Sequence, residues 1–272
     1  MIACSKTKNP TNDHDYAIKI QRCWNQARLT IYKKKIIDTF YKNLKGKKYE
    51  KLPSDNDCDE GHWLETQMDI PPNCKNEPDL LGYEQKKNSK VITFVDKQND
   101  KYWVGNKFSN RDKEKKILYW TTFQRTNSED VRIGGWKLDH WDCDGQCLQV
   151  DLYNNINVLY NYDKDLRPNK SSIVPDYYKN KQNHMIGQWS EKELKKTINN
   201  KFNVRGFYIL KKNRKNIYDT ICFGPKFSFS VFIKFFKEKK IYYDGYSKLN
   251  GRWRGTIRAK NAFWDTLITG EY

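Results

Sequence analysis

The sequence contains no apolar stretch that approaches the ~18 residues of a membrane-spanning helix. Its first residues, MIACSKTKNPTNDHDY, also lack the charged head and apolar middle of a secretory signal. Seven cysteines, an odd number, are spread along the chain, which is typical of reduced thiols rather than of a disulfide framework. No segment repeats at a fixed period, which argues against a solenoid. These absences lead us to expect a cytoplasmic protein that has no membrane partner.

Acidic residues are scarce relative to basic ones. The chain of 272 residues has 33 Asp and Glu against 51 Lys and Arg, a formal net charge of +18. Such an excess of positive charge is typical of proteins that bind a polyanion. Hydrophobic residues make up only 37% of the chain, but aromatic residues reach 15% and supply large apolar surfaces. We therefore expect an ordered protein with a polyanionic partner. Charge that only keeps the protein in solution is the alternative.

The hydrophobic pattern indicates both helices and strands. Apolar residues at helical spacing over 16–44 predict one or two helices with a lysine-rich outer face. Residues 61–68 resemble a short helix, and 79–95 a β-hairpin. Ser190 followed by Glu193 is a capping-box pattern, which predicts a helix over 190–200, and the segments beyond it are mostly strand-like.

The order of these elements gives the fold class. We expect an α+β protein in which a mixed β-sheet is flanked by helices. The N-terminal helical, basic region should span residues 1–60, and one main domain should span 61–272.

The stretch PDLLGYEQKK places charged groups inside an otherwise apolar segment. On a strand, Glu84 and Lys86 should lie on one face and Gln85 on the other. The Leu-Leu-Gly stretch can bend and bring Asp79 back beside Glu84. Two carboxylates and the main-chain carbonyl of Gln85 would form an oxygen-only site suited to Mg²⁺, and Lys86 could orient a water beside a phosphate. A surface ion pair on an ordinary strand is the alternative interpretation.

The run GHWLETQMDIPPNCKNEPDLLGYEQKKNSKVITF resembles the PD-(D/E)XK nucleases. It is most similar to the MvaI/BcnI group of restriction enzymes and to their relative MutH, the nicking enzyme of mismatch repair. In that group a helix carries a glutamate, and a following hairpin carries the Asp and the Glu-x-Lys. Glu65, Asp79, Glu84 and Lys86 match these positions. The resemblance extends more loosely through the C-terminal region, over roughly 61–268.

The resemblance implies a type II restriction endonuclease of PD-(D/E)XK fold. It implies Mg²⁺-dependent cleavage of double-stranded DNA that leaves 5′-phosphate and 3′-hydroxyl ends. Asp79 and Glu84 would bind the metal, Lys86 would position the attacking water, and Glu65 would act through a metal-bound water. It also suggests a monomer, with a cognate DNA methyltransferase as genetic partner. A MutH-like strand-nicking repair endonuclease and a non-catalytic DNA-binding protein stay open as alternatives.

Basic residues near the C-terminus are candidates for DNA recognition, in a segment around 200–262. The run NGRWRGTIRAK contains three arginines at even intervals, which would project from one face of an extended strand. Arginine can bind guanine O6 and N7 together, which lysine cannot match. Phosphate clamps are the alternative role for them. The candidates in this run are Arg252, Arg254, Arg258 and Lys260.

A second basic run, ILKKNRKN, is expected to be a loop that contacts DNA phosphates without reading bases. Its candidate residues are Lys211 and Lys212.

The run DHWDCDGQC also gathers side chains that bind metals. A zinc site needs four ligands, and Cys143 and Cys147 have no matching second pair. A calcium loop would place His140 at its first ligand position and Asp151, rather than Glu, at its twelfth. We therefore expect a turn between strands here.

Overall fold

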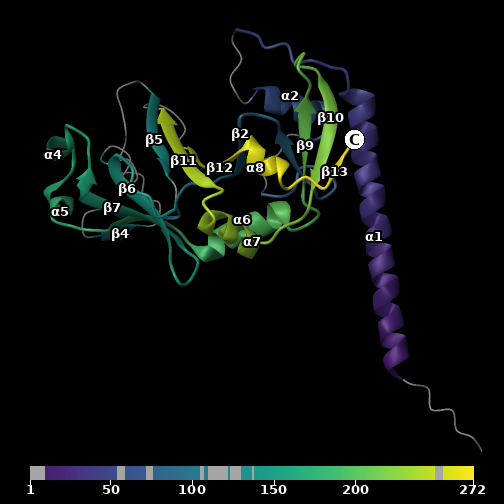
Figure 1. The fold of residues 1–272 in the computed structure, drawn as a ribbon, viewed down its shortest axis with the longest axis horizontal. Helices are drawn as coiled ribbons and strands as arrows, with labels where there is room; N and C mark the ends of the chain where they lie inside the picture. Colours follow the sequence, from purple (N-terminus) through teal and green to yellow (C-terminus); the bar gives the residue numbers. More distant parts are fainter. Residues whose placement is uncertain are drawn as a thin grey trace, which may run out of the picture.

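The structure is a computed structural model that describes residues 10–53, 59–71, 76–104, 107–109, 122, 130–136, 138–248 and 254–272. Three sheets follow one another along the long axis of the molecule, and α1 extends away at one end (Figure 1). The architecture confirms the expected α+β class.

The first sheet lies beside α1 (Figure 1) and contains both parallel and antiparallel pairs. Its outer strand β1 runs parallel to β9, and β9 pairs antiparallel with β10. The order is β1 (Glu84–Lys87), β9 (Phe207–Lys212), β10 (Tyr218–Gly224) and β13 (Gly270–Glu271). The helices on this side are α1 (Pro10–Asn43) and α2 (Asp59–Gln67).

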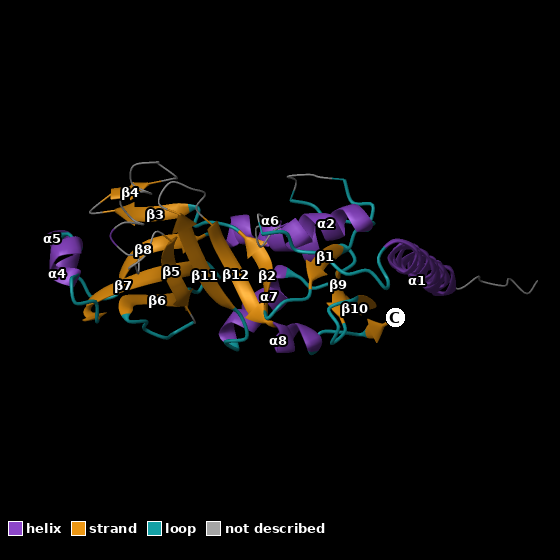
Figure 2. Cartoon of the chain, turned by 90° about the horizontal axis from the view of Figure 1, so that it is seen from above, coloured by secondary structure: helices purple, strands orange, loops and turns teal. Residues whose placement is uncertain are grey.

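The second and third sheets are antiparallel throughout. The second has the order β2 (Val91–Asp96), β12 (Arg254–Lys260), β11 (Tyr242–Lys248) and β5 (Asp130–Trp136). The third has the order β4 (Lys107–Ser109), β3 (Lys101–Val104), β8 (His184–Trp189), β7 (Ile156–Asp165) and β6 (Asp144–Val150). Seen from above, the second sheet separates the first from the third (Figure 2).

The remaining helices are short. The helices α6 and α7 lie together below the sheets (Figure 1), and α4 and α5 lie at the far end of the third sheet. Their bounds are α4 (Lys170–Ile173), α5 (Asp176–Lys179), α6 (Glu191–Phe202), α7 (Phe229–Lys237) and α8 (Asn261–Asp265). Among the described residues, no helix is long and apolar enough to cross a membrane.

Apolar side chains on both faces of β9 place the first sheet between two cores. Tyr208 and Leu210 pack into a core with residues of α1 and α2, whereas Phe207 and Ile209 pack into a larger core on the other face. This alternation is the period of two expected for a strand that is buried on both faces. The larger core is rich in stacked rings, such as Phe94 and Trp264 at 4.2 Å between centroids.

The last turns of α1 bury Ile36 and Phe40 in the same core as Leu64 of α2. The N-terminal region and the main domain therefore share a core, and the domain boundary at residue 60 stays a prediction.

The expected hairpin over 79–95 is wrong. β1 pairs with β9 and β2 pairs with β12, so the two strands belong to different sheets. The residues before β1 form a bend, with positive φ at Leu81 (49°) and Gly82 (84°). Ile92 and Phe94 of β2 pack into the larger core. Burial of these side chains places β2 in the second sheet. A local sequence pattern cannot reveal this pairing, because it depends on the tertiary fold.

The helix predicted from its capping box exists as α6, but the cap does not form. Ser190 makes no side-chain hydrogen bond to the helix. Its hydroxyl donates instead to Asp100, and Glu193 binds Lys97 at 3.1 Å. The same two side chains therefore tie α6 to the segment that follows β2.

Candidate active site

Glu84 and Lys86 project from one face of β1, as the strand period predicts. Lys86 Nζ lies 2.9 Å from Glu84 Oε1, and the side chains are 12% and 3% exposed. Lys86 Nζ also lies over the ring of Phe202, 5.3 Å from its centroid. A charged pair buried to this degree needs further polar partners to be stable. The site must therefore contain more than these two residues.

The bend before β1 carries Asp79 back to the strand. Leu80 and Tyr83 exchange two main-chain hydrogen bonds (3.0 and 2.9 Å), which close the turn. The guanidinium of Arg205 donates to Leu81 O at 2.6 Å and holds the turn from outside. Asp79 Oδ2 then accepts the main-chain N–H of Gln85 at 2.7 Å. The predicted return of Asp79 to the Glu84 strand is what the structure shows.

The main chain of Gln85 faces the open edge of the first sheet. The N–H groups of Glu84 and Asn88 donate to the carbonyls of Gly206 and Leu210 at 3.0 and 3.3 Å, so the main chain of even-numbered residues here faces β9. Gln85 faces the opposite way, as its hydrogen bond to Asp79 shows. Because the N–H and C=O of one strand residue point to the same side, the Gln85 carbonyl lies on the side of Asp79.

Asp79 sits in surroundings that oppose its ionisation. Burial, with the nearby charge of Glu84, raises the pKa of Asp79 to about 6, although Lys86 and the Gln85 N–H act in the other direction. A perturbed carboxyl of this kind is typical of a functional site. A cation bound beside Asp79 would therefore stabilise the ionised form of its carboxyl.

One carboxylate oxygen of Glu84 is left for a ligand. Glu84 Oε2 is buried and has no hydrogen-bond partner within the described part of the chain. Within that part, no three His, Cys, Asp or Glu side chains converge on one point. Oxygens of Glu84, Asp79 and the Gln85 main chain nevertheless fit a hard divalent cation that completes its shell with water or phosphate.

A second lysine contacts Glu84, and no sequence motif predicted this contact. Lys201 in the last turn of α6 places its Nζ 3.0 Å from Glu84 Oε1, the oxygen that Lys86 also contacts. The two residues are 117 positions apart in the chain. Only the packing of α6 beside β1 brings them together, so no motif spacing could have revealed the contact.

Glu65 lies on α2, behind the strand. Its carboxylate, with those of Asp79 and Glu84, is close enough to the hydroxyl of Tyr208 to help raise the pKa of that tyrosine, which burial raises first. The four acidic and basic residues matched by motif thus gather around β1 and α2. Their catalytic roles stay predictions.

The two lysines expected to bind phosphates are held by carboxylates of α8, β13 and α2. Lys211 Nζ lies 2.9 Å from Asp265 and 3.6 Å from Glu271. Lys212 forms an ion pair with Glu60 of α2. Both lie on strand β9 rather than in a loop. Their contact with DNA stays a prediction, and it would require each lysine to share or leave its partner.

The arginine segment is described only in part. Arg252 lies outside the described residues, as does Trp253, and only the backbone of Arg254 is described. In the register of β11 and β12, Arg254 and Arg258 lie opposite Tyr246 and Tyr242.

Arg258 is fixed by a nearly buried carboxylate. Its Nη1 lies 2.9 Å from Asp244 Oδ2, and the two side chains are 28% and 8% exposed. Arg258 Nε is buried without a hydrogen-bond partner in the described ranges. Lys260, the last residue of β12, is exposed. Base reading by these residues stays a prediction.

The expected turn covers only the first part of the 139–151 cluster, because Asp144–Val150 form strand β6. Asp151 accepts main-chain N–H groups of Tyr153 and Asn155, both at 2.9 Å. Cys147 is buried in β6, and burial raises its pKa to about 11. Neither it nor Cys143 joins a metal-binding group among the described residues. The cluster builds the two ends of β6.

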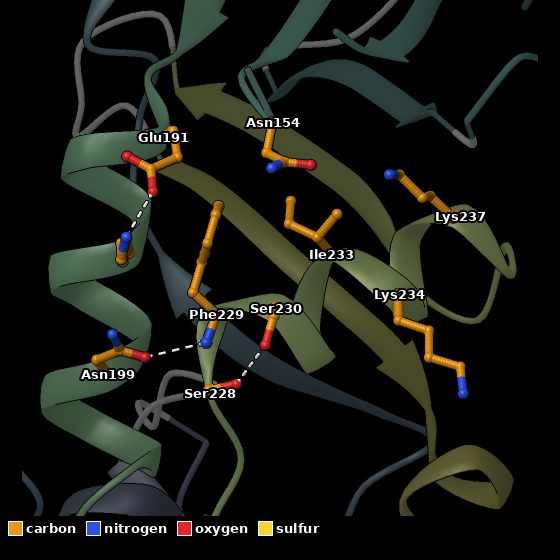
Figure 3. Close-up of a pocket in the computed structure, with 10 residues that line it drawn as sticks. Asn154, Glu191, Asn199, Ser228, Phe229, Ser230, Ile233, Lys234 and Lys237 are labelled. Atoms are coloured by element: carbon orange, nitrogen blue, oxygen red, sulfur yellow. Dashed lines mark hydrogen bonds and ion pairs between the residues drawn. The ribbon is translucent and has the colours of Figure 1, made fainter. Parts of the chain in front are cut away.

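A pocket of about 530 Å³ lies between α6 and α7 (Figure 3). Its polar groups bind one another: Asn199 Oδ1 accepts the N–H of Phe229 at 2.9 Å, and Ser228 and Ser230 hydroxyls lie 2.7 Å apart. None of the residues matched by motif lines it. The pocket is separate from the Asp79–Glu84 site.

A solved structure shares this fold, and a curated enzyme is similar to the chain in sequence. A solved complex of restriction endonuclease MvaI with its cognate DNA substrate matches 90% of this chain and 97% of that chain, with a TM-score of 0.59 and 10% identity. The fold is thus that of a restriction endonuclease. The type II restriction enzyme ScrFI of Lactococcus lactis subsp. cremoris is 28% identical over 274 residues, which cover 87% of this chain and 97% of that enzyme.

Residues 41–272 match the model of the LlaMI restriction endonuclease family. The chain belongs to this family and is a type II restriction endonuclease, a site-specific deoxyribonuclease. The family match begins within the last turn of α1, so most of that helix precedes the matched region.

Proposed function

We propose that the protein cleaves both strands of DNA with Mg²⁺ held by Asp79, Glu84 and the main-chain carbonyl of Gln85. The observation that carries the proposal is the buried Oε2 of Glu84, which has no hydrogen-bond partner in the part of the chain that the structure describes, beside a carboxyl whose pKa is raised to about 6. When bound, the ion would offset phosphate charge and lower the pKa of a water. The products would carry 5′-phosphate and 3′-hydroxyl ends.

In this proposal the two lysines that contact Glu84 have different roles. Lys86 shares the face of Glu84 and orients the attacking water, with its ammonium offsetting charge that builds on the phosphate. Lys201 contacts the same carboxylate oxygen at 3.0 Å and keeps Glu84 compensated when Lys86 turns to the water. Glu65 holds a water in the outer shell of the site.

Recognition of DNA is assigned to the basic face of β12. Arg258 is held by Asp244 at 2.9 Å, which limits its side-chain freedom and suits directional binding to a guanine. Arg252, Arg254 and Lys260 extend the same segment. If these arginines read bases, changing each one to Ala should relax discrimination at one base position. A uniform loss over all sequences would assign them to phosphates instead.

We further propose that the protein acts as a monomer and that its host carries a methyltransferase for the same site. A nuclease with this activity would cut unprotected chromosomal DNA. Sedimentation at equilibrium tests the monomer, and cleavage of host DNA before and after site methylation tests the partner.

The decisive experiment is incubation of the protein with plasmid DNA with and without Mg²⁺. Discrete linear fragments that appear only with Mg²⁺ support the proposal. Nicked circles that never become linear would instead support a strand-nicking enzyme. Retarded but intact plasmid under all metal conditions would contradict a nuclease role for the site.

A further inference from the structure

Gln85 connects the catalytic edge of β1 to the core behind it. Its main-chain N–H donates to Asp79 Oδ2 at 2.7 Å. Its side chain points to the opposite face of the strand, where Gln85 Oε1 accepts the hydroxyl of Tyr208 at 2.8 Å. One residue is therefore held at two points, by its main chain at the open edge of the sheet and by its side chain on the face opposite Glu84.

This double hold matters because β1 is an edge strand of the first sheet. Within the described residues, only β9 pairs with it. On the open side, no described strand forms ladder hydrogen bonds with the main-chain N–H and C=O of Gln85. An edge strand of four residues is free to tilt unless side chains fix it.

Tyr208 is well suited to fix it. The residue lies directly opposite Gln85 in the parallel register of β1 and β9, and its side chain is fully buried. The ring packs 5.8 Å from Phe223, and burial raises the pKa of its hydroxyl well above its usual range. The hydroxyl is thus a neutral donor on a rigid ring.

We propose that Tyr208 is a positioning residue of the metal site: through the side chain of Gln85 it fixes the residue whose main-chain N–H holds Asp79 and whose main-chain carbonyl faces the metal. The inference rests on the proposed function of Asp79 and Glu84. It assigns a hydroxyl in the core, which touches neither DNA nor metal, to the geometry of the site.

Loss of that hydroxyl should loosen the site without disturbing the core. Tyr208→Phe keeps the ring and leaves Gln85 Oε1 without its donor. A net hydrogen bond of this kind corresponds to roughly a five- to tenfold change in an equilibrium constant. We expect metal affinity to fall by about that factor, with kcat reduced and the KM for DNA unchanged.

The test is calorimetric titration of Ca²⁺, as the probe ion, into the full chain bound to a DNA fragment that the wild type cuts. The matched control is Tyr218→Phe, because Tyr218 is also fully buried in this core and its hydroxyl donates to Glu60 at 2.8 Å. Only Tyr208→Phe should weaken Ca²⁺ binding. Equal weakening in both variants would show a general core effect and overturn the inference.

A double-mutant comparison adds a second readout. Gln85→Met removes the acceptor but keeps the main-chain carbonyl, so it should weaken Ca²⁺ binding like Tyr208→Phe. Combining the two should add little to either one. Fully additive losses would mean that the two side chains act separately, which overturns the inference.

Failure of this inference differs from failure of the proposed site. If Tyr208→Phe binds Ca²⁺ normally while Asp79→Asn with Glu84→Gln does not, the positioning role is wrong and the metal site stands. If both the Tyr208→Phe variant and this double variant bind Ca²⁺ like the wild type, the metal site itself is wrong.

Discussion

The carboxylates of Glu84 and Glu60 lie on opposite faces of β1, and each contacts two lysines. At Glu84, both Lys86 and Lys201 use the same oxygen, at 2.9 and 3.0 Å, and the other oxygen is buried without a partner in the described part of the chain. At Glu60, both oxygens are engaged: Lys87 lies 3.2 Å from Oε2, while Oε1 contacts another lysine and accepts a tyrosine hydroxyl.

This difference distinguishes a structural cluster from a ligand site. A buried polar atom without a partner costs stability, so natural proteins rarely keep one without a function. The cluster of Glu60 ties α2 to the ends of β1 and β9 and leaves nothing for a ligand. The cluster of Glu84 keeps one buried oxygen without a partner in the described part of the chain, and a ligand could bind there.

The largest effect is expected at Lys86, one of the two neighbouring lysines of β1. Lys86→Ala should reduce cleavage by roughly 10²–10⁴-fold, the usual contribution of a group that manages proton transfer. Binding to DNA in Ca²⁺ should change little, because Lys86 serves the water rather than the duplex. Plasmid cleavage and gel retardation measure the two quantities.

Lys87→Ala is the matched control, since Lys87 binds Glu60 on the other face. Its cleavage rate should stay within a few-fold of wild type, and its stability should fall by about 1 kcal/mol or less. Near-normal cleavage by Lys86→Ala would refute the assignment.

The second prediction rests on pKa shifts of opposite direction in the two clusters: the pKa of Asp79 is raised, and that of Glu60 is lowered. Burial, with the charge of Glu84, raises the pKa of Asp79 to about 6. The folded state therefore holds this proton more tightly than the unfolded chain, so the ionised carboxyl lowers stability at pH above 6. Asp79→Asn should increase the unfolding free energy at pH 8 by at most about 3 kcal/mol. The gain should disappear as pH falls toward 4.

Glu60→Gln should do the reverse. Burial opposes the charge of Glu60, but hydrogen bonds from Lys212 and Tyr218 outweigh it and lower its pKa. Its contribution to stability is present above the ordinary pKa of a glutamate and is lost as pH falls through the lowered folded value. Glu60→Gln should therefore destabilise at pH 8. Urea unfolding at pH 4 to 8 checks both variants, and the same sign in both would contradict the comparison.

The smallest expected effect concerns Lys201. Without Lys201, Lys86 alone would balance the negative charge of Glu84, and it would be less free to orient water. We expect Lys201→Ala to lower kcat by about tenfold, a loss near 1.4 kcal/mol, and to leave DNA affinity unchanged. Lys195→Ala, on the same helix and paired with Glu191 at 2.9 Å, should cleave like the wild type. Equal losses in both variants would mean that α6 acts only as a structural support.

Local sequence was enough to predict the short-range part of the site. The strand period placed Glu84 and Lys86 on one face, and the flexible Leu-Leu-Gly stretch allowed Asp79 to return, as its contact with the Gln85 N–H shows. These relations depend on a few neighbouring residues and on backbone geometry. They needed no knowledge of the tertiary fold.

The long-range part could not be predicted from local pattern. Lys201 reaches Glu84 only because α6 leads into β9, which pairs in parallel with β1. The expected hairpin failed for the same reason, since strand pairing is decided by burial across the whole domain. Ser190 shows a related limit: the helix was predicted correctly, but the residue binds Asp100 rather than the helix end.

The most direct test of this account is a Ca²⁺ titration of Glu84→Gln and Glu60→Gln, each bound to a DNA fragment that the wild type cuts. Each change removes the charge of a carboxylate that contacts two lysines. The account predicts that Glu84→Gln loses Ca²⁺ affinity by tenfold or more, about 1.4 kcal/mol at least, and that Glu60→Gln binds like the wild type. Unchanged binding by Glu84→Gln, or an equal loss in Glu60→Gln, would contradict it.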